Sequence, residues 1–284
     1  LGWNPNEIVG IKAEIKNSFG ETPATSLLTI PSGDLPLYSI SLRLIPNNPD
    51  TIQKEFSNNE KDIKLSGLSI GNAILPDQGF NQLWLDFDNN GNIFGFYGYS
   101  ISNIFQLEFL NVGSFSDNYL RNNKAISVKE TFFSSGNFNN RFGGKLNILS
   151  PLRGDPLWLS TRITLGRDQK SVQGYTFAEL LGKFSLYNID LNLNPKYSWN
   201  GFESIGGIGI GINYKLNKKI SLIKEFNFNH SYKEENNNTF SVRYIHNPEK
   251  SVDFYYTNAL GLQDMGQLFK SESSKFGIRL NLLY

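Results

Sequence analysis

The sequence predicts an all-β protein that forms a closed antiparallel transmembrane β-barrel of about 16 strands. Apolar and polar residues alternate with a period of two along most of the chain, which is the pattern of strands with one apolar and one wet face. Clusters of asparagine, glycine and proline separate these segments, as turn residues do. The segments are too numerous for an ordinary two-layer sandwich, whereas a closed barrel uses every strand and leaves no edge.

The composition excludes several classes of functional site and partner. The 284 residues include no cysteine and two histidines, and the net charge is +1. Missing cysteine excludes disulfides, thiolate metal ligands and cysteine nucleophiles, and the balanced charge indicates no nucleic-acid partner. No apolar run is long enough for a transmembrane helix, but a barrel strand is only half apolar. The chain begins at Leu1, so we expect that any signal peptide has already been removed.

The strands are placed by the alternating segments between turns. The expected strands are 7–18, 37–45, 63–71, 81–88, 92–101, 103–113, 124–133, 141–149, 156–166, 174–182, 183–194, 205–215, 218–228, 238–246, 250–257 and 275–284. Totals of about 12 or 14 are alternatives, because strand 81–88 and the boundary near Gly182 are the least clear. No shift in composition marks a linker, so we expect a single barrel domain over 1–284.

A stripe of glycines alternates with isoleucines between Gly206 and Gly211. Its glycines superficially suggest a phosphate-binding loop. Strict alternation instead predicts a strand with a smooth inner face. Such a face has room for a large neighbouring side chain or an inserted loop.

The C-terminal segment carries apolar residues at every second position and ends on an aromatic residue. These residues are Phe276, Ile278, Leu280, Leu282 and Tyr284. Over nine residues the pattern resembles the C-terminal β-signal of Gram-negative outer-membrane proteins, which the barrel assembly machinery reads. The resemblance implies a location in the outer membrane of a Gram-negative-type bacterium, with outer-membrane lipids, lipopolysaccharide and the barrel assembly machinery as partners. Porins of this size are often homotrimers, so a homotrimer is a further expectation. The alternative is an ordinary final strand.

Aromatic residues gather near the ends of the expected strands, as in the interfacial girdles of membrane barrels. We assign Trp158 and Tyr255 to this girdle, with stacking on sugar rings inside the lumen as the alternative.

If the apolar face meets lipid, the other face lines a lumen. The expected pore-lining residues are Lys12, Lys16, Arg43, Arg162, Arg243, Arg279, Glu14 and Asp253, together with Asp86 and Glu108. The first two and last three strands would be neighbours at the barrel closure. That arrangement collects Lys12, Lys16, Arg43, Arg243 and Arg279 on one wall. It predicts a locally basic wall with a mild preference for anions. Ordinary ion pairs between strands are the alternative.

Nothing in the sequence indicates catalysis, a cofactor or a metal site. His230 and Ser231 are adjacent and therefore point to opposite faces of a strand, and His246 lies at an expected turn. We therefore expect no enzyme but a porin-like outer-membrane channel for passive diffusion of small hydrophilic solutes. The alternative is a non-conducting outer-membrane barrel in envelope assembly, polysaccharide export or adhesion, with segment 46–62 as a partner surface or plug. Further alternatives are a soluble β-rich binding domain and a barrel hydrolase, which would need a serine or an acidic residue from another strand near His230.

Overall fold

A computed structural model describes residues 2–3, 9–16, 37–44, 67–114, 139–167, 174–199, 204–230, 235–247 and 249–284. The chain divides into two compact units, Leu1–Ile52 and Gln53–Tyr284. In the first unit, β1 (Gly2–Trp3), β2 (Val9–Lys16) and β3 (Leu37–Leu44) form an antiparallel three-stranded sheet in the order β1-β2-β3.

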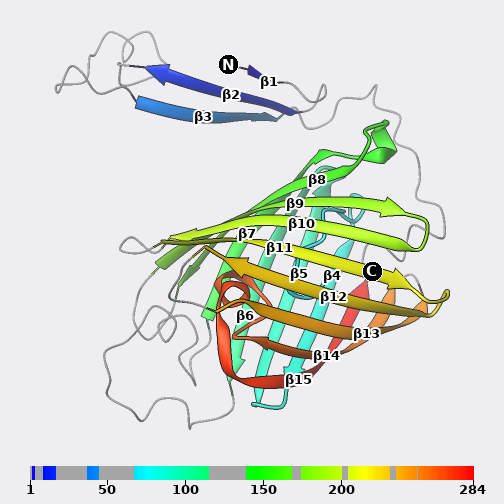
Figure 1. Cartoon of the computed structure of the whole chain (residues 1–284). Coiled ribbons are helices and arrows are strands. Elements are labelled where there is room, and N and C mark those ends of the chain that lie inside the picture. The colour runs from blue at the N-terminus through cyan, green and yellow to red at the C-terminus, as the bar shows by residue number, and fades with distance from the viewer. Residues whose placement is uncertain are drawn as a thin grey trace, which may run out of the picture. The chain divides into compact units, whose positions relative to one another are not determined.

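The second unit contains a closed antiparallel barrel of 12 strands (Figure 1). Its strands are β4 (Asn81–Asp88), β5 (Asn92–Ser102), β6 (Phe105–Ser114), β7 (Asn139–Leu149), β8 (Trp158–Arg167), β9 (Gly174–Leu186), β10 (Ile189–Trp199), β11 (Ser204–Lys215), β12 (Ile220–Asn229), β13 (Asn237–Asn247), β14 (Lys250–Ala259) and β15 (Lys270–Leu283). Each strand pairs with its neighbours in sequence, and β15 closes the ring on β4. The predicted closed antiparallel β-barrel is confirmed.

The expected number of about 16 strands is wrong, because the barrel has 12. Segments 7–18 and 37–45 do contain strands, but β2 and β3 pair with each other in the first unit. Residues 67–71, the described part of the expected strand 63–71, form no strand. Segments 124–133 and 46–62 lie outside the described residues. Alternation of polar and apolar residues predicts only that a strand has one wet and one apolar face. The strands of a small separate sheet show the same pattern, so alternation does not distinguish them from barrel strands.

The structure decides the two least clear features of the expected strand order, which are strand 81–88 and the boundary near Gly182. The uncertain strand 81–88 is real and closes the barrel as β4. The boundary near Gly182 is wrong, because β9 continues through it and Gly182 pairs with Leu193. The chain turns instead after Leu186, where Tyr187 takes a left-handed φ of 52°.

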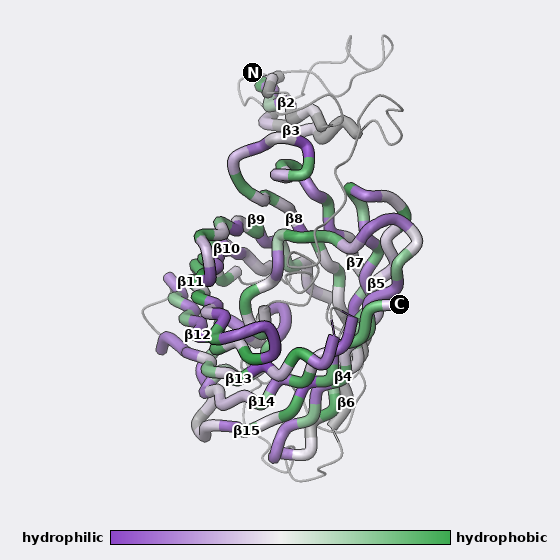
Figure 2. The backbone as a smooth tube through the Cα atoms, turned by 90° about the vertical axis from the view of Figure 1, so that its right-hand side faces the viewer, coloured by the Kyte–Doolittle hydropathy of each residue, from purple (hydrophilic) through white to green (hydrophobic). Residues whose placement is uncertain are grey.

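The barrel is apolar outside and polar inside. In β10, Leu191 and Leu193 face outward and are 44% and 51% exposed, whereas Asn192 and Asn194 face inward and are 8% and 0% exposed. Figure 2 shows hydrophilic and hydrophobic residues alternating along the barrel strands. Such an inverted arrangement suits a lipid environment. In the described part of the chain, no helix has the length and hydrophobicity to cross a membrane.

Candidate functional site in the barrel lumen

Two segments lie among the inward-facing side chains of the barrel. The first, which we call the luminal segment, comprises residues 67–76 and precedes β4. The second, which we call the inner loop, comprises residues 260–269 between β14 and β15 and contains a 3-10 helix, η4 (Asp264–Leu268). Both are buried: Ile70 and Ile74 are 1% exposed, and Leu268 is 0% exposed. The two segments fill space that an open barrel of this kind would leave to water.

The barrel wall binds the main chain at the start of the luminal segment. The backbone N–H groups of Leu68 and Ser69 donate to the two carboxylate oxygens of Glu225, at 2.9 and 2.7 Å. The carbonyl of Leu68 accepts from Arg279 Nη1 at 3.2 Å and from Gln263 Nε2 of the inner loop at 3.0 Å. Strands β12 and β15 therefore bind this end of the segment.

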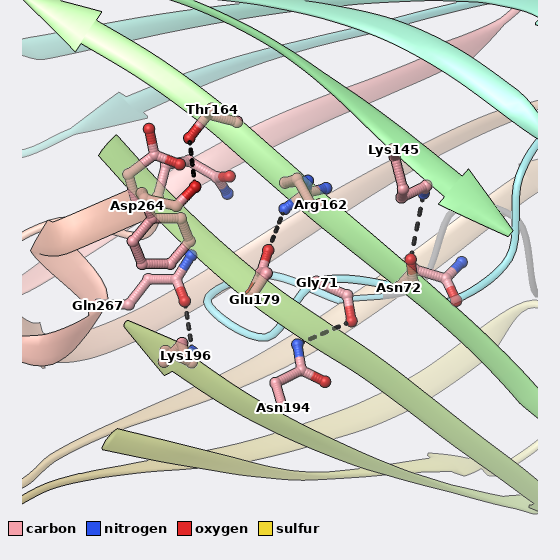
Figure 3. Close-up of polar contacts among 12 residues, drawn as sticks. Gly71, Asn72, Lys145, Arg162, Thr164, Glu179, Asn194, Lys196, Asp264 and Gln267 are labelled. Atoms are coloured by element: carbon pink, nitrogen blue, oxygen red, sulfur yellow. Dashed lines mark hydrogen bonds and ion pairs between the residues drawn. The ribbon is translucent and has the colours of Figure 1, made fainter. Parts of the chain in front are cut away.

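The rest of the luminal segment reaches a different part of the wall. The ammonium of Lys145 on β7 donates to the carbonyls of Asn72 and Ile74, at 3.1 and 2.9 Å. Asn194 on β10 donates to the carbonyl of Gly71 at 3.2 Å, and Ser160 on β8 donates to the carbonyl of Ala73. Figure 3 shows the Lys145 and Asn194 contacts. Because β7 and β8 lie far around the ring from β12 and β15, the segment bridges separate parts of the wall.

Apolar side chains of the luminal segment fill spaces in the wall. Leu68 packs with buried residues that include Ile223 and Tyr255, and Ile74 packs in a cluster with Trp158 and Leu181. The chain itself also approaches the wall closely, since a Cβ on Gly71 would lie 2.8 Å from Leu181 Cδ2.

The glycine stripe on β11 faces these inserted side chains. A Cβ on Gly209 would lie 3.1 Å from Ile70, and one on Gly207 would lie 2.7 Å from Leu268 of the inner loop. The prediction that this smooth face receives a large side chain or an inserted loop is confirmed.

The inner loop is anchored mainly by polar contacts. Asp264 accepts hydrogen bonds from Arg141 at 2.5 Å and from Tyr175 at 3.0 Å. The side chain of Gln267 accepts from Lys196, and its carbonyl accepts from Asn237 at 2.7 Å. Burial raises the pKa of Asp264 above its ordinary value, although the positive charge of Arg141 partly offsets this effect.

Ion pairs also connect the strands of the wall. Arg243 and Asp253 face each other on β13 and β14 and make two hydrogen bonds, of 2.5 and 2.8 Å. Arg279 on β15 binds Asp86 on β4 at 2.7 Å, and Arg162 on β8 contacts Glu108 at 2.9 Å. The buried charged side chains on the barrel strands are the basic Arg141, Lys145, Arg162, Lys183, Lys196, Arg243, Lys275 and Arg279 and the acidic Asp86, Asp88, Glu108, Glu179, Asp190, Glu225 and Asp253.

The structure divides the expected pore-lining residues between the two units. Arg162, Arg243, Arg279 and Asp253, with Asp86 and Glu108, are buried on barrel strands. The others, Lys12, Glu14, Lys16 and Arg43, lie on β2 and β3 of the first unit.

The expected basic wall that joins these two groups is therefore wrong. The neighbour of β15 at the barrel closure is β4, not one of the first strands of the chain. Lys12 instead forms an ion pair with Glu14 within its own strand. A pore-lining role for the residues on the barrel strands stays a prediction.

The girdle assignment is wrong for Trp158 and Tyr255. Both side chains are buried inside the barrel, at 9% and 4% exposure, and the Tyr255 hydroxyl donates to Asp86 at 2.5 Å. By contrast, Tyr197 and Trp199 face outward and are 51% and 52% exposed. A strand-end position does not decide which face an aromatic side chain occupies.

Sequence reasoning missed the residues that hold the two inner segments. Lys145 and Glu225 occupy inward positions of strands that were expected, but neither was named among the expected pore-lining residues. Lys196 was assigned to a loop because β10 was expected to end too early. The contacts of all three depend on segments distant in sequence, which alternation does not reveal.

The histidines gain no catalytic partner in the described residues. His230 Nδ1 lies 3.1 Å from the carbonyl of Gly206. No group of three or more acidic or histidine side chains that could hold a metal ion occurs in the described part of the chain. The absence of enzymatic activity stays a prediction.

Comparison with known proteins adds information about the fold. No protein-family model and no curated protein sequence matches the chain. Among solved structures, a KdgM porin in complex with disordered oligogalacturonate is similar with a TM-score of 0.51 and 8% identity, covering 72% of this chain and 98% of that one.

Two further solved structures are similar at lower scores. The COG4313 outer membrane channel from Pseudomonas putida F1 has a TM-score of 0.48 and 11% identity, covering 74% of this chain and 97% of that one. The NanC porin has a TM-score of 0.47 and 7% identity, covering 71% and 98%. All three are outer-membrane channel or porin structures. The similarity to the KdgM porin structure shows that the barrel of this chain has a porin-like outer-membrane β-barrel fold.

Proposed function

We propose that this chain is a porin-like outer-membrane channel for small hydrophilic solutes and that the luminal segment closes it in this conformation. One observation carries the proposal. The luminal segment is attached to the wall through side-chain hydrogen bonds and adds no strand to the barrel. The ring of 12 paired strands is complete without it. Release of the segment would leave a closed wall around a polar interior, which is what a water-filled channel requires.

We further propose a mild preference for anions. The buried charged side chains on the barrel strands include eight basic and seven acidic ones, the seventh being Asp88, whose side chain is 3% exposed. Lys145 and Lys196 take part in none of the ion pairs between described residues. Both donate to oxygens of the two inner segments, and Lys196 donates in addition to Asn227 of the wall at 2.8 Å. When these segments leave, both ammonium groups face the lumen and attract anions.

Single-channel recording in planar bilayers tests the channel proposal. The variant Gly71→Leu places a large side chain where a Cβ would already lie 2.8 to 3.1 Å from Leu181, Glu179 and Arg162, so it expels the luminal segment. We expect discrete conductance steps from this variant and rare openings from the unmodified chain. The control Gln78→Ala changes an exposed side chain next to the segment and should behave as the unmodified chain does.

The anion preference is tested by the reversal potential of Gly71→Leu in asymmetric KCl. A reversal potential that favours cations would contradict it.

The alternative is a non-conducting outer-membrane barrel in envelope assembly, polysaccharide export or adhesion. The occupied lumen is the observation that favours it. If Gly71→Leu folds and exposes its luminal segment to protease but passes no current, this alternative replaces the channel.

The location and partners are also proposals. The exposed apolar face supports contact with outer-membrane lipids and lipopolysaccharide, and Phe276, Ile278 and Tyr284 lie on that face at 62%, 42% and 60% exposure. We propose that this C-terminal strand is read by the barrel assembly machinery and that the barrel associates as a homotrimer. Membrane fractionation and chemical crosslinking test both points, and a monomer in the cytoplasmic fraction would contradict them.

A further inference from the structure

The wall recognises the luminal segment by its main chain. Glu225 accepts from two successive N–H groups, Lys145 binds two carbonyls, and Asn194 binds a third. These bonds end on peptide groups, which every residue carries. The Ser69 hydroxyl adds a side-chain contact, since it donates to Glu225 at 2.6 Å and accepts from Asn227 at 3.1 Å. The wall therefore offers an arrangement of donors and acceptors that fits the main chain of an irregular segment with bends at residues 68–70 and 73.

Opposite charges act on these wall groups without forming a direct ion pair between described residues: Glu108 and Glu179 act on Lys145, and Lys196 acts on Glu225. Neither Lys145 nor Glu225 takes part in any ion pair between described residues, although both are buried, at 3% and 1% exposure. A buried charge is costly unless hydrogen bonds compensate it. The peptide groups of the luminal segment supply that compensation, with N–H groups at the carboxylate and carbonyls at the ammonium.

Side-chain spaces accompany the main-chain contacts. Ile70 lies against the glycine stripe of β11, within 3.1 Å of the Cβ position of Gly209, and Ile74 packs with Trp158 and Leu181. A Cβ on Gly71 would lie 2.8 to 3.1 Å from the side-chain ends of Leu181, Glu179 and Arg162, so a larger residue here requires these side chains or the segment to move. Main-chain hydrogen bonds combined with spaces for particular side chains are the means by which proteins bind extended peptides.

We propose that the lumen is a binding site for a polypeptide segment, which the luminal segment occupies in this structure and which a separate peptide occupies when that segment is released. The ligand has branched aliphatic residues at the positions of Ile70 and Ile74 and glycine between them. The proposal goes beyond channel activity, since binding requires a released segment but no flow of solute.

The test uses a fluorescent synthetic peptide with the sequence of residues 67–76. Its binding to the full chain in detergent micelles is measured by fluorescence anisotropy. We expect saturable binding to Gly71→Leu, whose own segment is expelled, and at least about tenfold weaker binding to the unmodified chain. A peptide with leucine in place of its glycine at position 71 should also bind about tenfold more weakly than the native peptide.

A second variant keeps the proposal testable if Gly71→Leu does not fold. Ser69→Pro removes the backbone N–H and the hydroxyl that both donate to Glu225, and it changes no residue of the barrel wall. It should release the segment and bind the native peptide as Gly71→Leu does. Heat-dependent mobility in SDS gels confirms that each barrel is folded.

A wall variant identifies the binding site. Adding Glu225→Gln to Gly71→Leu removes the charge that accepts two peptide N–H groups and should weaken peptide binding about tenfold. Glu249→Gln, at an exposed turn, is the matched control and should leave binding unchanged.

Two results would overturn the proposal. In the first, Gly71→Leu and Ser69→Pro both fold and expose their luminal segment to protease, but neither binds the peptide. In the second, the native peptide and the peptide with leucine at position 71 bind equally. Conductance without peptide binding would overturn this inference and leave the channel standing, and peptide binding without conductance would do the reverse.

Discussion

The buried charges of the barrel fall into two groups. Arg243 and Asp253 face each other on neighbouring strands and neutralise each other within the wall. Lys145 and Glu225 lie in the same wall, but their partners are peptide groups of the luminal segment. The first group holds strands together whether or not the lumen is occupied. The second group is satisfied only while a segment is present, so equally buried charges can serve barrel stability or lumen occupancy.

Breaking a wall pair should have the largest effect. Arg243→Met leaves the carboxylate of Asp253 buried without its main partner. Removing one member of a buried pair typically costs about 3–5 kcal/mol, so we expect a comparable loss in the free energy of unfolding, measured by urea titration in lipid vesicles.

The double variant Arg243→Met/Asp253→Leu is the control for this experiment. It removes both charges and should recover most of the lost stability. If the single variant is as stable as the unmodified chain, this pair does not contribute to barrel stability as the comparison requires.

Breaking a contact to the luminal segment should have an intermediate effect, and on a different quantity. Glu225→Gln weakens the two bonds to Leu68 and Ser69, and bonds to charged groups contribute about 1.5–3 kcal/mol. We expect more frequent channel openings in planar bilayers and little change in the urea midpoint. A large drop in the urea midpoint without more frequent openings would show that Glu225 contributes to barrel stability, as the wall ion pairs do.

Acidity should affect the inner loop through Asp264. Burial raises the pKa of this carboxyl in the docked loop, so the docked loop holds a proton more tightly than a released loop does. Docking therefore strengthens as pH falls and weakens as pH rises through the raised pKa. Arg141 and Tyr175 bind this carboxylate, and the charges of Arg162 and Glu179 also act on it.

Limited proteolysis of the inner loop between neutral and acidic pH measures this effect. We expect slower cleavage at acidic pH in the unmodified chain and no such difference in Asp264→Asn, which cannot titrate. Faster cleavage at acidic pH would show that the attraction to Arg141 outweighs burial.

The smallest effect on stability should come from Tyr284→Ala. The backbone of Tyr284 exchanges two hydrogen bonds with Asn81, at 2.6 and 2.9 Å, and the substitution retains both. We expect a change in unfolding free energy of less than about 1 kcal/mol but a clear loss of protein in the outer-membrane fraction. Unchanged assembly would contradict a role of the terminal aromatic ring as an assembly signal.

Particular elements show how far the sequence predicts the fold and the site. Alternation places Asp86, Glu108, Arg162 and Arg243 on the wet face, and all four are buried inside the barrel. Alternation also places Lys12 on a wet face, yet that residue belongs to the separate sheet. Period-two patterning reports which side of a strand is polar but contains no information on which strand lies beside it.

The sequence by itself determined the all-β class, most of the barrel strands and their polar face, because these follow from local alternation and turn residues. It also indicated that the glycine stripe of β11 makes room for an inserted side chain. Only the tertiary structure decided that 12 strands close through β15 and β4 and that residues 67–76 occupy the interior. Closure and occupancy depend on contacts between distant residues, such as Glu225 with Ser69. A buried charge can be satisfied by any suitably placed peptide group, so its own sequence neighbourhood does not reveal its partner.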